Sequence, residues 1–299
     1  MKNLLLVAGL LFGSMAYGAE GNLRYSVSVT KFPNESGWSG RWAVGDGFTT
    51  MLTDALQQSG NFIVLGDREM REAAMDEQDL VASGRTAGGK KAAQTGRMTP
   101  AQLLVRGSVT HVEYDTKGGS GGLNFMGVSV GGGGSKAEVN ITIYLVDSET
   151  GQVKASQKVV GEAGKRKLRV GYYGNKLGGL TGNLAGFEKD NLGLACNDAV
   201  EQCVEFLVQQ LETVPWEGSV MSANDERVII NRGEREGVAE GMTFDVGSIE
   251  ELVDEDTGEV LDVEISSLGT ISVTSVREKI AYCTPLAGVE KGMTVMPVR

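Results

Sequence analysis

The chain has 299 residues, 41% of them hydrophobic, with a formal net charge of −11 and a pI of about 4.8. This length leaves room for two domains with cores of their own, and the acidic balance excludes nucleic acid and anionic lipid as general partners. Glycine is the outlier in composition, with 43 residues beside only five prolines, which indicates many tight turns or closely packed strands.

Residues 1–18 have the pattern of a cleavable secretory signal peptide. A short basic end precedes an apolar run over 4–12, and the small residues Ala16 and Gly18 stand before a cut at Ala19. The apolar run is well short of the roughly 20 residues that a membrane-spanning helix needs. The sequence therefore predicts an exported protein that works in the envelope of a bacterium.

The first half of the mature chain alternates strands and helices. Apolar residues at every second position predict strands, and apolar residues at helical spacing predict helices. In chain order we expect a strand over 23–32, a helix over 44–59, a strand over 62–65, a helix over 68–83, a helical turn at 99–101 and a strand over 103–114. Asp67 is placed to cap the second helix, and residues 84–96 predict an exposed basic loop.

Two regions in the middle of the chain are rich in glycine. They cover residues 115–134 and 162–191. Between them, residues 135–146 alternate apolar and polar side chains, which predicts a strand with one apolar face. A turn at 147–151 leads to a returning strand over 152–161, and an amphipathic helix over 191–211 closes the domain.

The three cysteines favour burial over a shared disulfide. Cys196 and Cys203 are seven residues apart on the last helix, about 10 Å along its axis, which is too far for a disulfide. We expect small buried apolar side chains, and a bridge from Cys283 to either one stays open.

Six segments occur in a characteristic order: the Asn34–Gly37 loop, the helix end Met51–Leu56, the strands Phe62–Leu65 and Leu104–Val109, the segment Lys117–Gly119 and the run Val139–Gln152. In this order they resemble one family, the curli secretion channel (CsgG/HfaB) family. The resemblance covers about residues 24–211. It implies a homo-oligomeric ring in which each subunit adds two β-hairpins to one shared outer-membrane barrel above a periplasmic α/β domain.

By this resemblance the first hairpin covers about residues 113–146 and the second about 158–191. A closed barrel satisfies every backbone hydrogen bond in lipid, and its strands need only one apolar face. The candidate membrane residues are Leu123, Phe125, Val128, Val130, Val139, Ile141, Ile143, Leu168, Val170 and Tyr172. The density of glycine leaves flexible soluble loops open as the alternative.

The resemblance also implies a pore constriction. Channels of this family narrow the pore with an aromatic residue on the loop after the first strand, where this chain has Trp38, Arg41 and Trp42. The loop is shorter than the family's, and the two tryptophans could equally pack at subunit contacts.

The C-terminal part, residues 215–299, predicts a separate small β-barrel. Short strands alternate with turn signals at regular spacing. The glycines of residues 233–242, together with the Asp254–Glu259 segment, resemble the C-terminal SH3-like domain of the flagellar assembly protein FlgT. We interpret Asp254–Gly258 as a hairpin turn, because the remaining ligands of a calcium loop are missing.

No motif supports catalysis, a metal or a cofactor. The chain has one histidine, His111, which we expect to pack within a strand, and no nucleophilic triad, metal-spaced cluster or phosphate loop is present in the sequence. The expected fold class is α+β: a periplasmic α/β domain over residues 19–214 with two hairpins in a shared transmembrane barrel, followed by the SH3-like domain.

The functional hypothesis is a ring-shaped secretion channel in the bacterial outer membrane with domains in the periplasm. It would export an unfolded polypeptide, such as a curli-like fibre or adhesin subunit, with periplasmic accessory proteins as further partners. Four strands per subunit would give about nine copies if the ring matches the largest known barrel, of about 36 strands. The alternative is a periplasmic structural ring of a flagellar, pilus or secretion apparatus without a pore. The family's channels are lipoproteins, whereas this chain has no cysteine before Cys196, so we expect an unlipidated mature N-terminus.

Overall fold

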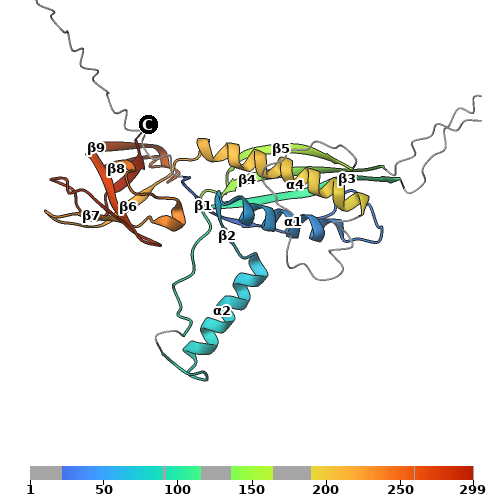
Figure 1. Cartoon of the computed structure of the whole chain (residues 1–299), viewed down its shortest axis with the longest axis horizontal. Helices are drawn as coiled ribbons and strands as arrows, with labels where there is room; N and C mark the ends of the chain where they lie inside the picture. Colours follow the sequence, from blue (N-terminus) through green and yellow to red (C-terminus); the bar gives the residue numbers. More distant parts are fainter. Residues whose placement is uncertain (1–21, 90–91, 116–135, 164–189, 259, 299) are drawn as a thin grey trace, which may run out of the picture. The chain divides into compact units, whose positions relative to one another are not determined.

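The computed structural model describes two compact units of the chain (Figure 1). The first covers residues 24–215, and the second contains the residues from Trp216 onward together with Asn22 and Leu23. The described residues are 22–89, 92–115, 136–163, 190–258 and 260–298. The predicted signal peptide lies outside them. Within the described residues, the helices are too short or too polar to cross a membrane.

The first unit is built on a five-stranded mixed sheet with the strand order β2-β1-β3-β4-β5. Its strands are β1 (Tyr25–Val29), β2 (Phe62–Leu65), β3 (Leu103–Asp115), β4 (Lys136–Asp147) and β5 (Val153–Glu162). Its helices are α1 (Val44–Ser59), α2 (Arg68–Ala82), α4 (Asn191–Gln210) and the 3-10 turn η1 (Leu211–Thr213). Strand β1 pairs in parallel with β2 and β3, whereas β3, β4 and β5 form an antiparallel series.

Helices α1 and α4 pack together on one face of this sheet (Figure 1). Phe48 and Leu52 of α1 and Leu207 of α4 are fully buried there. Side chains alternate between the two faces of a strand, so the apolar half of β4 lies under α4. The core of the unit is therefore the layer between these two helices and the sheet.

The structure corrects three of the candidate membrane residues. Val139, Ile141 and Ile143 of β4 are fully buried within the subunit and contribute to its core under α4. A lipid-facing side chain would be exposed in the isolated subunit. The apolar face of this strand was correctly predicted, but assigning it to the membrane was wrong because α4 already covers it.

Cys196 and Cys203 lie on the buried side of α4 as free thiols, which confirms their prediction as small apolar side chains. Burial raises the pKa of both thiols, that of Cys196 to about 12. Cys283 is also buried and free, so the bridge left open by the sequence is absent.

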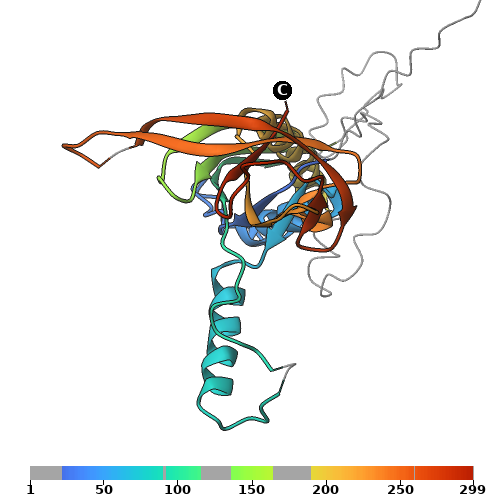
Figure 2. The ribbon, with the colours of Figure 1, turned by 90° about the vertical axis from the view of Figure 1, so that its left-hand side faces the viewer.

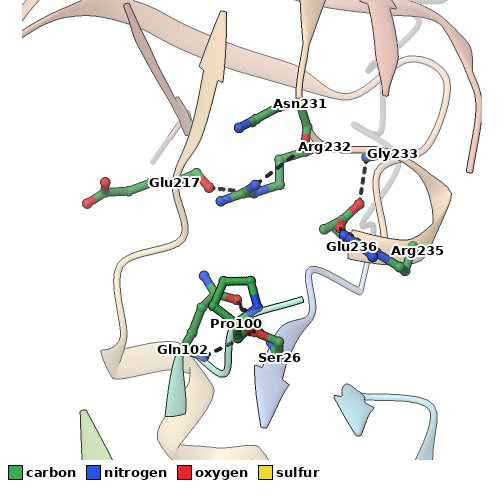
Figure 3. Close-up of polar contacts among 9 residues, drawn as sticks. All are labelled: Ser26, Pro100, Gln102, Glu217, Asn231, Arg232, Gly233, Arg235 and Glu236. Atoms are coloured by element: carbon green, nitrogen blue, oxygen red, sulfur yellow. Dashed lines mark hydrogen bonds and ion pairs between the residues drawn. The ribbon is translucent and has the colours of Figure 1, made fainter. Parts of the chain in front are cut away.

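The predicted helical turn at 99–101 is wrong, because this segment has no helical structure and hydrogen-bonds to Ser26 near the start of β1. The Ser26 hydroxyl donates to the Pro100 carbonyl at 2.8 Å, and the Gln102 backbone N–H donates to the Ser26 carbonyl at 3.0 Å. The Gln102 side-chain oxygen in turn accepts from the Ser26 backbone N–H at 3.0 Å (Figure 3). These hydrogen bonds between distant segments outweigh the local helix-start signal of Thr99 and Pro100.

The second unit is a closed barrel with the strand order β10-β7-β6-β11-β8-β9. Its elements are β6 (Gly218–Ala223), β7 (Val228–Ile230), the 3-10 turn η2 (Glu234–Glu236), β8 (Thr243–Val253), β9 (Val260–Val276), β10 (Ala281–Cys283) and β11 (Thr294–Pro297). The predicted small barrel is confirmed, whereas its likeness to an SH3 domain stays a prediction. Figure 2 shows the β8–β9 ribbon extending beyond the other strands of the barrel.

Aromatic stacking and one half-buried cation, Arg232, lie together in the barrel unit. The rings of Trp216 and Phe244 stack at 5.2 Å, and the Arg232 guanidinium lies 5.9 Å from the Trp216 ring. Arg232 Nε donates to the Glu217 carbonyl at 2.8 Å, and the buried Glu236 carboxylate accepts from the Gly233 N–H at 2.9 Å (Figure 3). Desolvation lowers the pKa of Arg232, and the nearby Glu236 charge opposes this shift.

Candidate functional site at the hairpin end of the sheet unit

Both glycine-rich segments leave and re-enter the sheet unit at the same end. The last residue of β3, Asp115, pairs with the first residue of β4, Lys136. One residue further along β4, the Ala137 carbonyl accepts from the Ala163 N–H at 2.8 Å, directly after β5. Tyr114 completes this arrangement, because its hydroxyl donates to Asp190 Oδ2 at 3.0 Å, just before α4. We call this region the hairpin end.

Asp190 joins two elements at the hairpin end. Its Oδ1 caps α4 by accepting from the Leu192 N–H at 3.0 Å, while its Oδ2 accepts from Tyr114 at the end of β3. The hydrogen bond to Asp190 raises the pKa of the Tyr114 hydroxyl, and partial burial and the Asp190 charge act in the same direction. The positive charge of Arg41 acts in the opposite direction and lowers this pKa.

The β1–α1 loop is anchored to the middle of β3. The Glu35 N–H donates to the Val109 carbonyl at 2.8 Å, and the Val109 N–H donates to the Pro33 carbonyl at 2.9 Å. Within the loop, the Asn34 side chain accepts from the Ser36 hydroxyl at 2.6 Å and donates to the Trp38 carbonyl at 2.8 Å. Side-chain hydrogen bonds of this kind replace the missing strand or helix pairing of a loop.

The loop presents the three predicted constriction residues together. Trp38 and Trp42 are half-buried and Arg41 is exposed. The Arg41 guanidinium lies 4.6 Å from the centre of the Trp42 ring, a cation–π arrangement. The Trp38 ring lies against Gly40, where an added Cβ would come within 2.0 Å of it. The chain thus carries two aromatic rings and one cation on a single hydrogen-bonded loop.

Three glutamates form a row that the sequence did not reveal. Glu113 pairs with Glu138, and Glu138 pairs with Glu162, so the row crosses three adjacent strands near the hairpin end. Glu138 alternates with the buried Ala137 and places the row on the sheet face opposite α4. Only the strand register brings these residues together, and a single sequence does not contain that register.

Seven of the candidate membrane residues lie outside the described residues and stay predictions. They are Leu123, Phe125, Val128, Val130, Leu168, Val170 and Tyr172. The two predicted hairpins have described bases. Residues 113–115 and 136–146 belong to the antiparallel β3–β4 pair, and residues 158–162 pair with β4.

The prediction that His111 packs within its strand is wrong. The pairing register of β3 and β4 shifts between Val109 and His111, and the imidazole is exposed there. A β-bulge redirects a side chain in this way. Across the described ranges, groups of three or more His, Cys, Asp or Glu side chains that could hold a metal ion are absent.

Comparisons with known proteins place the chain in a family. The family model described as "Curli production assembly/transport component CsgG" matches residues 14–242. No curated protein sequence matches the chain significantly. Similar solved structures include the PelC dodecamer from Paraburkholderia phytofirmans, at 12% identity and a TM-score of 0.31, covering 60% of this chain and 85% of that chain.

Two further structures have similar statistics. The hypothetical protein CT253 from Chlamydia trachomatis has 10% identity and a TM-score of 0.37, covering 64% of this chain and 99% of that chain. The lipoprotein GNA1162 from Neisseria meningitidis has 16% identity and a TM-score of 0.27, with the same coverage of 64% and 99%. The family match is the comparison that assigns the chain, because it spans well over half of the sequence. The chain therefore belongs to the CsgG family of curli production assembly and transport components.

Proposed function

We propose that this chain is a subunit of a ring-shaped outer-membrane secretion channel that exports an unfolded polypeptide, such as a curli-like fibre or adhesin subunit. Membership in the CsgG family supports a role in assembly and transport. The observation that carries the proposal is the hairpin end, where both glycine-rich segments leave and re-enter the sheet unit side by side. Both described units would lie in the periplasm, where accessory proteins give the transport its direction.

The lengths of the two segments suit membrane hairpins. The glycine-rich regions 115–134 and 162–191 comprise 20 and 30 residues, and a transmembrane strand needs about 9–11. Each segment is thus long enough for two strands and a short turn. Four strands from one chain cannot close a barrel, since the smallest have about eight. A shared barrel therefore requires a homo-oligomer, and about nine copies would reach 36 strands.

The β1–α1 loop supplies a constriction in this proposal. Trp38, Arg41 and Trp42 lie on a loop that hydrogen bonds anchor to β3, the strand that ends at the hairpin end. In a ring, one such loop from each subunit would surround the axis and narrow the passage to the width of an extended chain. Transport through it needs neither catalysis nor a cofactor from this subunit, and the chain is proposed to be no enzyme.

A periplasmic structural ring without a pore is the second candidate. The additional six-stranded barrel unit favours it, because its sequence is predicted to resemble a domain of the flagellar assembly protein FlgT. The two candidates differ in how the protein is held. A shared barrel is embedded in lipid, whereas a structural ring is attached by protein contacts.

Extraction and conductance separate the two candidates. For the channel we expect oligomers that only detergent releases from outer membranes, that migrate differently after heating, and that conduct ions in planar lipid bilayers. A ring that leaves the membrane in a high-salt wash and shows no conductance would contradict the channel and favour the structural ring. A porin-free membrane preparation from cells without the gene is the control for background conductance.

A further inference from the structure

A cleft of about 720 Å³ separates helix α2 from the sheet of its own subunit. One wall is formed by β1, the residues that follow it and β3, and the other wall is the first half of α2, from Arg68 to Met75. Leu104 and Arg106 of β3 alternate with the fully buried Val105, so the cleft lies on the sheet face away from α1 and α4. Ligand sites commonly have volumes of about 300–1,000 Å³, and this cleft has that size.

Helix α2 does not close the cleft by packing onto the sheet. Within this 15-residue helix, no side chain is buried. Lys31 Nζ lies 2.5 Å from Glu69 Oε1 and ties the helix to the chain after β1. A helix that packs closely on a sheet fills the intervening space with apolar side chains. Here the intervening space stays open, and most of its lining is polar.

The three carboxylates of the cleft lining already have partners. Glu69 pairs with Lys31, and Glu72 accepts from Arg68 Nε at 2.6 Å. Asp67 accepts, at 2.9 Å, the backbone N–H that it caps in the first turn of α2. These contacts occupy two of the four cations in the lining, Lys31 and Arg68.

The other two cations of the lining are guanidinium groups. Arg71 belongs to α2 and Arg106 to β3, so they line the cleft from its two opposite walls. Among the residues that the structure describes, no hydrogen bond or ion pair engages either side chain. Arg71 is also half-buried, and a partly desolvated guanidinium is stabilised by an anion that accepts its N–H groups. The lining has four cations against three carboxylates, and the uncompensated charge lies on these two arginines.

We propose that this cleft binds a doubly charged oxygen anion, a phosphate group or a dicarboxylate, between Arg71 and Arg106. Guanidinium groups bind such anions through two parallel N–H···O hydrogen bonds, and a dianion can engage one guanidinium on each wall. Leu104 and Met75 of the lining offer apolar contacts to the remainder of the ligand. The cleft belongs to a single subunit, so this site depends neither on the proposed ring nor on the membrane hairpins.

Thermal unfolding of the detergent-purified full-length protein tests the site with two probes, inorganic phosphate and succinate. At constant ionic strength, one or both should raise the unfolding midpoint above its value in sodium chloride, because a ligand of the folded state stabilises that state. The rise should saturate with concentration, whereas stabilisation by exclusion of an anion from the protein surface does not. A response to phosphate alone identifies a phosphate ligand, and a response to succinate alone identifies a dicarboxylate. Equal midpoints in all three salts would overturn the proposal.

Arginine variants locate the binding. Arg71→Gln and Arg106→Gln should each lower the apparent affinity for the anion about tenfold or more, because each removes one charged donor group. Arg85→Gln is the matched control, since Arg85 is exposed after α2 and does not line the cleft. An equal loss in all three variants, or no loss in the first two, would overturn the site. Circular dichroism checks that each variant is folded.

A variant with tighter binding separates the site from a general loss of structure. Glu72→Gln removes a carboxylate from the cleft and releases Arg68 from its ion pair, so the apparent affinity should rise severalfold. Glu77→Gln is an exposed change on the same helix outside the cleft lining and should bind as the wild type does. An equal rise in both variants, or no rise in Glu72→Gln, would contradict the proposed site.

Discussion

At the scale of single residues, Trp38 and Trp42 stand apart from the aromatic side chains of the core. Phe32 and Phe48 pack together with ring centres 5.0 Å apart and are buried, whereas the two tryptophans are half-buried on a loop that hydrogen bonds hold in place. Aromatic rings kept near the surface serve contacts with something else. In the proposed channel, that contact is with the exported chain.

Replacing both tryptophans should widen the passage. We expect Trp38→Ala combined with Trp42→Ala to raise single-channel conductance in planar bilayers, because two large side chains per subunit are removed from the narrowest part. Met221→Ala, an exposed change in the barrel unit, should leave conductance unchanged. If the double variant conducts as the wild type does but assembles poorly, the tryptophans lie at subunit contacts instead.

The sequence predicted which face of a strand is apolar, but it did not predict what that face packs against. Alternation in residues 135–146 correctly predicted a strand with one apolar face, but Val139, Ile141 and Ile143 meet a helix and not lipid. Both environments select the same apolar side chains, so periodicity alone cannot separate them. For His111, the bulge in the β3–β4 pairing decides exposure, and this bulge is a property of two strands together.

At the scale of elements, the packing of α4 on β5 depends on one glycine. An added Cβ at Gly161 would come within 2.0 Å of the Ala195 carbonyl oxygen and 2.8 Å of the Ala199 side chain. The close approach brings the helix down onto the sheet just before the hairpin end. This helix–sheet contact explains why residue 161 is a glycine. From composition alone, we attributed the many glycines only to tight turns or closely packed strands.

Gly161→Ala should therefore destabilise the sheet unit. We expect the free energy of unfolding to fall by about 1–3 kcal/mol or more, because backbone atoms must move to accept the methyl group. Chemical denaturation followed by circular dichroism measures it. Gly88→Ala is the matched control, since an added Cβ there meets nothing within 4 Å and its φ angle is ordinary. Equal stability of the two variants would contradict the close packing.

Local signals predicted those elements whose ends are set locally. Asp67 accepts from the Met70 N–H at 2.9 Å as the predicted cap of α2, and Gly60 ends α1 in the left-handed conformation with φ 69°. The prediction of a helical turn at 99–101 failed because Ser26, more than 70 positions away, forms a hydrogen bond with the Pro100 carbonyl in this segment. Strand β10 has three residues, too few for a periodic pattern, and its pairing with β7 and β9 defines it.

At the scale of the whole molecule, the family and the two-unit organisation were accessible from the sequence, and the assembly was not. The CsgG family match confirms the resemblance found in six ordered segments. The Glu113–Glu138–Glu162 row depends on strand register, and the proposed ring depends on further copies of the chain. Neither can be derived from the periodicity of one chain.

Electron microscopy of the detergent-purified full-length protein tests the central claim most directly. We predict closed rings of identical subunits, with a continuous β-barrel at the hairpin end of the sheet units and density for the β1–α1 loops around the axis. Rings with no barrel at that end, or monomers at every concentration, would contradict the account.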